Sequence, residues 1–172
     1  MRLQKPLIGK NINLTQLSTN DVSDRYLAWL NDFDVTRFME VRHNPPNFKQ
    51  QIKFVEDCLK SNNQILLGIF ENSARFIGTL KLTFLDQLNL EIGIMIGEKT
   101  LHGRGIGSES INLVIDWAKS KNLFAIHAGY DLRNNASKML FESLGFSKVK
   151  QIKESLDQEN SIVIERVVLL LN

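Results

Sequence analysis

Two segments in the first third of the chain repeat apolar residues at helical spacing. Residues 21–32 carry an apolar stripe at intervals of three and four, with Asp21 as a candidate N-cap. Residues 44–63 carry a second stripe, and Asn47 with Gln50 matches a capping box. A stripe of this spacing gives a helix one apolar face, so the pattern predicts two amphipathic helices packed against a core.

Strand-like segments surround these two helices. Apolar residues alternate with polar ones, or run together between short polar turns, in residues 11–17, 64–70, 75–85 and 88–98. The last three segments follow one another with only a few residues between them. Connections this short join antiparallel neighbours, so the sequence predicts a meander of three strands.

The second half of the chain alternates helices with strands. A helical stripe begins near Gly107 and ends near residues 121–122, and a strand-like segment follows at 123–130. Residues 135–145 predict a helix that ends at Gly145, a good C′ residue. The residues expected to face inward from this helix are Ala136, Met139, Leu140 and Leu144.

Two strand-like segments end the chain. "FSKVKQIKE" and "SIVIERVVLLL" flank "DQEN", which is expected to be a turn. The second segment is long and apolar enough to suit either the edge of a homodimer or a buried strand of the monomer. The predicted order is β-α-α-β-β-β-α-β-α-β-β, an α+β fold in a single domain over residues 1–172.

Composition narrows the class of protein. The chain has 172 residues, of which 43% are hydrophobic, and a net charge of +2, which argues against nucleic acid or a membrane surface as a partner. Its one cysteine, Cys58, fits a reducing compartment, and no apolar stretch suggests a signal peptide or a membrane span. We expect a cytoplasmic protein. His102 and His127 are too isolated to predict a metal site.

The stretch "LHGRGIGSESINLVIDWA" at residues 101–118 places three glycines directly before a helix. Glycines let backbone N–H groups approach a ligand, and a helix N-terminus adds donors and partial positive charge, so the pattern predicts a phosphate site. The alternative is a plain strand-to-helix turn. A Walker A loop would need a lysine after Gly107, and a dinucleotide fingerprint would need the third glycine one residue later.

These residues resemble the pyrophosphate loop of the GCN5-related N-acetyltransferases (GNAT), Arg/Gln-x-x-Gly-x-Gly/Ala. "NNASKMLFESLGF" at 134–146 is similar to a second signature of that family, and the ribosomal-protein and sugar-amine branches look nearest. The resemblance implies the GNAT fold, with a mixed, mostly antiparallel sheet, and acetyl-coenzyme A as the co-substrate. This chain departs from the family pattern at His102, where Arg or Gln is usual. It departs again at Phe141, where many members carry a tyrosine that protonates the leaving thiolate.

The resemblance also implies which residues hold the cofactor. The strand "EIGIMIGE" would carry the pantetheine, the glycine loop would bind the pyrophosphate, and the later helix would add an asparagine and small residues. The implied cofactor residues are Ile94, Met95, Ile96, His102, Gly103, Arg104, Gly105, Ile106, Gly107, Ser108, Asn134, Ser137 and Phe141. Asn134 could serve instead as a helix N-cap, or serve both needs.

Acetyl transfer requires a neutral amine, a donor to the carbonyl oxygen and a proton for the leaving thiolate. We expect Glu91 to act as the base through water, although a salt bridge at the strand edge would also explain it. A backbone N–H near Met95, at an expected bulge, would be the oxyanion donor. Ser137, Tyr130 or water would protonate the thiolate.

The acceptor is expected to bind near the connection at residues 32–46. Arg37, Glu40 and Arg42, together with Glu91, could meet a charged or sugar-like amine, whereas an ordinary solvated loop is the alternative. An amino sugar, nucleotide sugar or other small amine competes with a protein N-terminus as acceptor. Two further alternatives are a coenzyme A-binding module without catalysis and an unrelated phosphate-binding domain.

Overall fold

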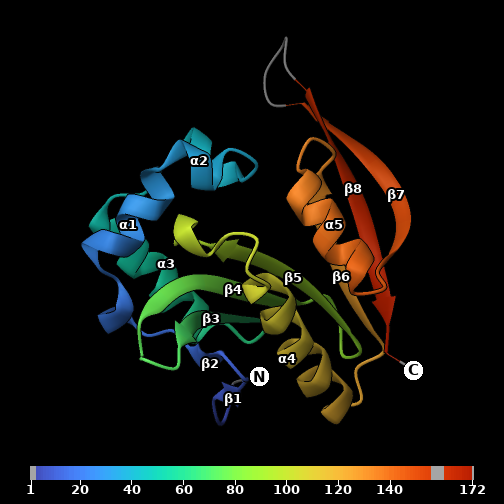
Figure 1. Ribbon diagram of the computed structural model, residues 1–172, viewed down its shortest axis with the longest axis horizontal. Helices are drawn as coiled ribbons and strands as arrows, with labels where there is room; N and C mark the ends of the chain where they lie inside the picture. Colours follow the sequence, from blue (N-terminus) through green and yellow to red (C-terminus); the bar gives the residue numbers. More distant parts are fainter. Residues whose placement is uncertain (1–2, 156–160, 172) are drawn as a thin grey trace.

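The computed structural model describes residues 3–155 and 161–171, and its strands form one eight-stranded sheet (Figure 1). The sheet order is β1-β2-β3-β4-β5-β6-β8-β7, and the fold is the expected α+β class. The strands are β1 Leu7–Ile8, β2 Ile12–Gln16, β3 Gln64–Glu71, β4 Phe76–Phe84, β5 Asn89–Ile96, β6 Ala125–Asp131, β7 Ser147–Ser155 and β8 Ser161–Leu170. The helices are α1 Asp24–Asn31, α2 Phe33–Thr36, α3 Phe48–Lys60, α4 Ile106–Ser120 and α5 Asn135–Ser143, with 3-10 turns at Thr19–Asp21, Glu40–His43 and Lys99–Leu101.

Two apolar cores lie on the two faces of the sheet. One packs α4 against the strands through Ile111, Val114 and Ala118, all fully buried. The other packs α1 and α3 against the opposite face through residues such as Trp29 and Val55. Alternation along each strand sends successive side chains to opposite layers, which explains why both cores draw on the same strands. The meander of β3, β4 and β5 is confirmed as antiparallel.

The N-terminal helices begin where local capping dictates. Asn47 and Gln50 form the predicted capping box at the start of α3. The Asp21 cap is wrong: the Ser23 side chain caps α1 by accepting from Tyr26 N–H at 3.3 Å, whereas Asp21 binds back to Ser18. The connection 32–46 is partly helical, because it contains α2 and the 3-10 turn after it.

β5 and β6 separate after a short parallel ladder. They pair over three residues, from Asn89↔Ala125 to Glu91↔His127, and α4 supplies the crossover that a parallel pair requires. Beyond that point the strands diverge, and β6 continues by pairing with β8 (Figure 1). The sheet therefore has an opening between β5 and β6, with α5 beside it.

The structure corrects the predicted inward face of α5 and shows whether β8 is an edge strand or a buried one. Met139 is 69% exposed and Ala136 is exposed, because this face of α5 looks onto the opening rather than into the core. β8 pairs with β6 on one side and β7 on the other, so it is an interior strand. The predicted turn "DQEN" lies outside the described residues. Within the described ranges, no helix is both long and apolar enough to cross a membrane.

Candidate active site

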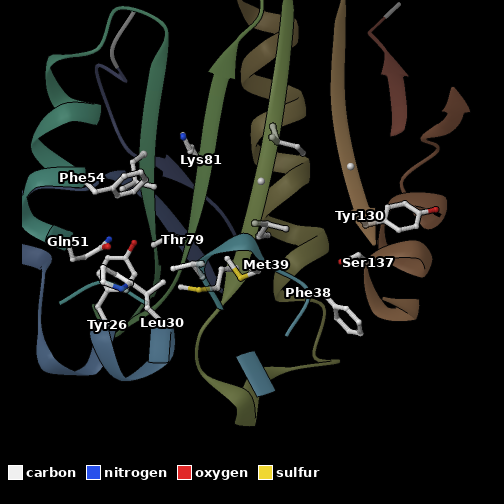
Figure 2. A pocket seen from close by; sticks show the side chains of 18 of the residues that line it. Tyr26, Leu30, Phe38, Met39, Gln51, Phe54, Thr79, Lys81, Tyr130 and Ser137 are labelled. Atoms are coloured by element: carbon white, nitrogen blue, oxygen red, sulfur yellow. The ribbon is translucent and has the colours of Figure 1, made fainter. Parts of the chain in front are cut away.

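Two adjoining cavities meet at the opening between β5 and β6. The loop-side cavity, about 660 Å³, is bounded by the glycine loop, the edge of β5 and one face of α5. The helix-side cavity, about 490 Å³, lies between the sheet and the layer of α1 and α3 (Figure 2). The residues lining both are Phe38, Met39, Ile94, Met95, Asn134 and Ser137. A molecule in one cavity can therefore touch a molecule in the other at this junction.

The backbone of β5 alternates between its neighbour β4 and the opening. Gly97 N–H donates to the Ile77 carbonyl of the β4 side at 3.0 Å, so odd-numbered groups face β4. Even-numbered groups face the other way, and His102 Nε2 binds the Ile96 carbonyl there at 2.7 Å. By the same alternation, the N–H and carbonyl of Ile94 lie on the edge that β6 has left. They are free to pair with an extended ligand.

The sequence placed the oxyanion donor at a backbone N–H near Met95, at an expected bulge. β4 and β5 stay in unbroken register through Thr79↔Met95, so the expected bulge does not form in these described strands. The Met95 backbone faces β4, and its side chain packs with the α1 and α3 layer. The free N–H at the junction belongs to Ile94.

The glycine loop presents backbone donors to the loop-side cavity. Gly103 and Gly105 have φ of 73° and 79°, a left-handed conformation that favours glycine. A Cβ added to either would meet no described atom within 4 Å, so both face open space. α4 starts at Ile106, and the first N–H groups of a helix have no partner within it. The cavity thus receives the donors of Ile106, Gly107 and Ser108.

Other loop residues have structural reasons for their identity. A Cβ on Gly107 would lie 3.2 Å from the Leu140 side chain, so this glycine lets α4 and α5 approach closely. Arg104 is exposed and does not line the loop-side cavity. The pKa of Glu109 in the first turn of α4 lies below its ordinary value. Burial alone would raise it, but hydrogen bonds from Asn11 outweigh that effect and join this carboxylate to the N-terminal segment.

The N-terminus of α5 lies at the junction. Asn134 caps the helix, because its side-chain oxygen accepts the Ser137 N–H at 3.1 Å, so the N-cap reading of this residue holds. Asn134 and Ser137 both line both cavities. Phe141 is buried at 3% exposure and stacks on Tyr130 with ring centres 6.0 Å apart.

Tyr130 directs its hydroxyl away from the junction. The hydroxyl donates to buried Glu165 at 3.3 Å, and Figure 2 shows it pointing away from the other lining side chains. Burial, followed by the negative charge of Glu165, raises the pKa of Tyr130 to about 12. The nearby Lys148 ammonium, 2.9 Å from Glu165, holds the pKa of that carboxyl below its usual range. The Tyr130 ring therefore packs against Phe141, and its hydroxyl does not face the cleft.

Most of the residues that line the helix-side cavity alone were not predicted as site residues from the sequence. They come from α1, α3 and β4, and the principal ones are Tyr26, Leu30, Gln51, Phe54, Thr79 and Lys81 (Figure 2). Burial raises the pKa of Tyr26 to about 12. Thr79 and Lys81 alternate with apolar residues in "FIGTLKLTF". Polar positions inside an otherwise apolar strand are the sequence feature that could have indicated a cavity on this face of the sheet.

The predicted acceptor residues are dispersed. Glu91 is ion-paired with Arg166 of β8 and lies two positions before Gly93 on the same strand face. Arg37 lines the loop-side cavity, not the helix-side one. Glu40 and Arg42 line a third cavity of about 170 Å³ with Arg166. The structure therefore does not gather the four predicted residues around one ligand.

Comparison with known proteins identifies the family of this chain. Residues 11–147 match the model of the acetyltransferase (GNAT) domain. The chain belongs to the GNAT family. An uncharacterized protein of Methanocaldococcus jannaschii is 31% identical over 144 residues, which are 84% of this chain but 30% of that protein. The human alpha/beta-tubulin-N-acetyltransferase 9 is 27% identical over 157 residues, 83% of this chain and 75% of that protein.

Solved structures agree on the fold. RimL, a ribosomal L7/L12 alpha-N-protein acetyltransferase in complex with coenzyme A, superposes with a TM-score of 0.85 at 13% identity, over 97% of this chain and 98% of that one. Spermidine N-acetyltransferase from Vibrio cholerae, in complex with coenzyme A and spermine, gives 0.81 at 17% identity, over 94% and 96%. With the family match, the N-acetyltransferase relatives support an acyltransferase.

Proposed function

We propose that the protein transfers an acetyl group from acetyl-coenzyme A to a primary amine by direct attack. The observation that carries the proposal is the continuity of the loop-side cavity. It joins the free edge of β5 at Ile94 to the backbone donors at Gly103, Gly105 and the start of α4. An extended arm with a pyrophosphate at one end fits a strand edge followed by an anion-binding helix start.

The residues of the loop side suit the parts of coenzyme A. Ile106, Gly107 and Ser108 would hold the pyrophosphate through their N–H groups, and the Ile94 carbonyl and the Ile96 N–H would pair with the pantetheine amides. The open space beside Gly103 and Gly105 is consistent with a bound pyrophosphate, because a side chain at either position would occupy that space. Arg37, which lines the same cavity, is added as a candidate phosphate contact.

The junction supplies groups for the chemical step. The amine nitrogen bonds to the acetyl carbon, the bond from that carbon to sulfur breaks, and coenzyme A leaves as a thiolate. The Ile94 N–H would stabilise charge that develops on the carbonyl oxygen. Ser137, which lines both cavities, or water would supply the proton to the thiolate. Glu91 would take a proton from the amine through water.

The acceptor enters from the helix side in this proposal. A small amine is the first candidate, since the cavity there has a volume of about 490 Å³ and is covered by α1 and α3. A protein N-terminus is the second candidate. It is favoured by the relatives named N-acetyltransferase 9, one of which is named for alpha/beta-tubulin. This chain spans only 30% of the Methanocaldococcus relative, so both acceptors are proposed for the domain described here.

Release of the coenzyme A thiol tests the proposal. The protein is mixed with acetyl-coenzyme A and, in separate reactions, amino sugars, amino acids and short peptides with free N-termini. We expect thiol release to depend on one class of amine and to exceed hydrolysis without amine. Binding of acetyl-coenzyme A with no amine-dependent release would indicate a coenzyme A-binding module. Absence of binding would contradict the proposed use of acetyl-coenzyme A as the co-substrate.

A further inference from the structure

Lys81 occupies an unusual position in the floor of the helix-side cavity. It lies in the middle of β4, where the register places Leu66 of β3 on one side and Gly93 of β5 on the other. A Cβ added to Gly93 would meet no described atom within 4 Å, so the space beside Lys81 is open. The glycine leaves room for a ligand between Lys81 and the opening where the acetyl group would lie.

Lys81 has no carboxylate counter-ion among the residues that the structure describes. Its ammonium lies 5.4 Å from the centre of the Phe54 ring, a cation–π contact. No carboxylate among residues 3–155 and 161–171 forms a salt bridge with it. Other lysines, such as Lys53 and Lys99, have such partners. Of the described residues lining the helix-side cavity, Lys81 alone carries a formal charge.

The surroundings of Lys81 strengthen its effect on a ligand. Phe54, Leu66 and Leu30 make the cavity largely apolar, and Gln51 and Thr79 add uncharged polar groups (Figure 2). A charge beside apolar walls acts through a lower effective dielectric than one in bulk water. A polycationic acceptor would meet this ammonium with no carboxylate in the described lining to offset it, so the cavity disfavours a polyamine.

We propose that the acceptor is a primary amine that also carries a carboxylate, and that Lys81 binds this carboxylate. The inference rests on the proposed function. Adjacent strands are about 4.8 Å apart, so roughly one to two strand spacings, about 5–10 Å, separate Lys81 from the free edge of β5. The carboxylate of the acceptor lies that far from the reacting amine. Lys81 is then a specificity-determining residue, and Gly93 provides the path between the two groups.

Pairs of acceptors that differ only in charge test this proposal. One arm compares 4-aminobutyrate and 6-aminohexanoate with their carboxamides, to probe a free amino acid. A second arm compares tripeptide amides with free N-termini that carry Glu or Gln at the second position, to probe an acidic peptide. We expect about a tenfold higher kcat/KM for the carboxylate in the arm that matches the natural acceptor.

Variants of Lys81 assign the preference to this residue. Lys81→Met should bring the carboxylate-to-amide ratio to about one, whereas Lys81→Arg should keep most of it. Lys53→Met is the matched control, because Lys53 is an exposed lysine of α3 paired with Asp57, and it should keep the full ratio. Calorimetric affinity for acetyl-coenzyme A checks that each variant is folded and that the loop side is intact.

The outcomes separate this inference from the proposed function. Transfer to amines with no carboxylate preference, or with a preference that Lys81→Met retains, would overturn the role of Lys81 and leave N-acetyltransfer standing. Efficient transfer to spermidine over the amino acids and peptides would overturn it as well. Tight cofactor binding with no transfer to any amine would overturn the proposed function, and the inference with it.

Discussion

On the loop side of the cleft most of the groups proposed to hold the cofactor belong to the backbone, whereas on the helix side the polar groups belong to side chains. The loop side offers the N–H groups of Ile94 and of residues 106–108, with glycines where a Cβ would intrude. The helix side offers Tyr26, Gln51 and Lys81 from three separate elements. A backbone site requires a local conformation, and a side-chain site requires tertiary assembly.

This difference separates what each half contributes. In the proposed function, backbone donors would recognise the phosphates and amides that every acetyl-coenzyme A molecule carries, and would set cofactor binding. Side chains of mixed character would distinguish one amine from another, and would set acceptor choice. Substitutions on the two sides should therefore have separable effects.

Gly105→Val should have the largest effect on the loop side. Valine is β-branched and strained at a φ of 79°, and its side chain would enter the open cradle. We expect a loss of affinity for coenzyme A on the order of a hundredfold, or about 2.8 kcal/mol, by calorimetry. Gly93→Ala is the control on the helix side and should leave this affinity within about twofold. Equal losses in both variants would break the comparison.

Glu91→Gln should lower turnover at neutral pH with little change in cofactor affinity. If Glu91 takes the amine proton through water, kcat should fall by about a hundredfold, the lower end of general-base effects. Glu56→Gln, on the exposed face of α3, is the control. A pH–rate profile that Glu91→Gln leaves unaltered would assign Glu91 to its ion pair with Arg166 alone.

Tyr26→Phe should change how stability depends on alkaline pH. Burial raises the folded-state pKa of Tyr26 to about 12, above the ordinary value of 10. Between these values the unfolded chain loses a proton that the folded chain keeps, so stability falls as pH rises. Removing the hydroxyl should lessen the loss between pH 9 and 11 by about 1 kcal/mol, measured by urea unfolding. Parallel curves for the two proteins would contradict this.

The smallest effects are expected at the junction. Ser137→Ala should lower kcat a few-fold, because the serine lines both cavities. Tyr130→Phe should lower it less, because the tyrosine hydroxyl is bound to Glu165. Steady-state kinetics with the best acceptor compare the two. A larger loss in Tyr130→Phe would mean that this hydroxyl turns toward the thiolate during the reaction.

The two halves also differ in how much of them the sequence predicts. The glycine turn, the start of α4 and the order of the strands other than the short β1 follow from local spacing, and the structure confirms these features. The identity of the free donor did not follow, because it depends on which edge of β5 is unpaired. The sequence therefore placed this donor only near Met95.

The acceptor side could not be assembled from sequence because its residues are far apart along the chain. Tyr26, Phe54 and Lys81 meet only after α1, α3 and β4 pack together. The sequence favoured charged residues in the connection 32–46 as acceptor contacts. In the structure, Arg37 lines the loop-side cavity and Arg42 lines a third cavity.

Residue-resolved amide hydrogen exchange with and without acetyl-coenzyme A tests the division of the cleft most directly. The account predicts that the cofactor slows exchange at Ile94, Ile96 and residues 106–108. It predicts little change at Phe54 and Lys81 until a carboxylate-bearing amine is added. Protection centred on α3 and β4 by the cofactor alone, or none at the edge of β5, would contradict it.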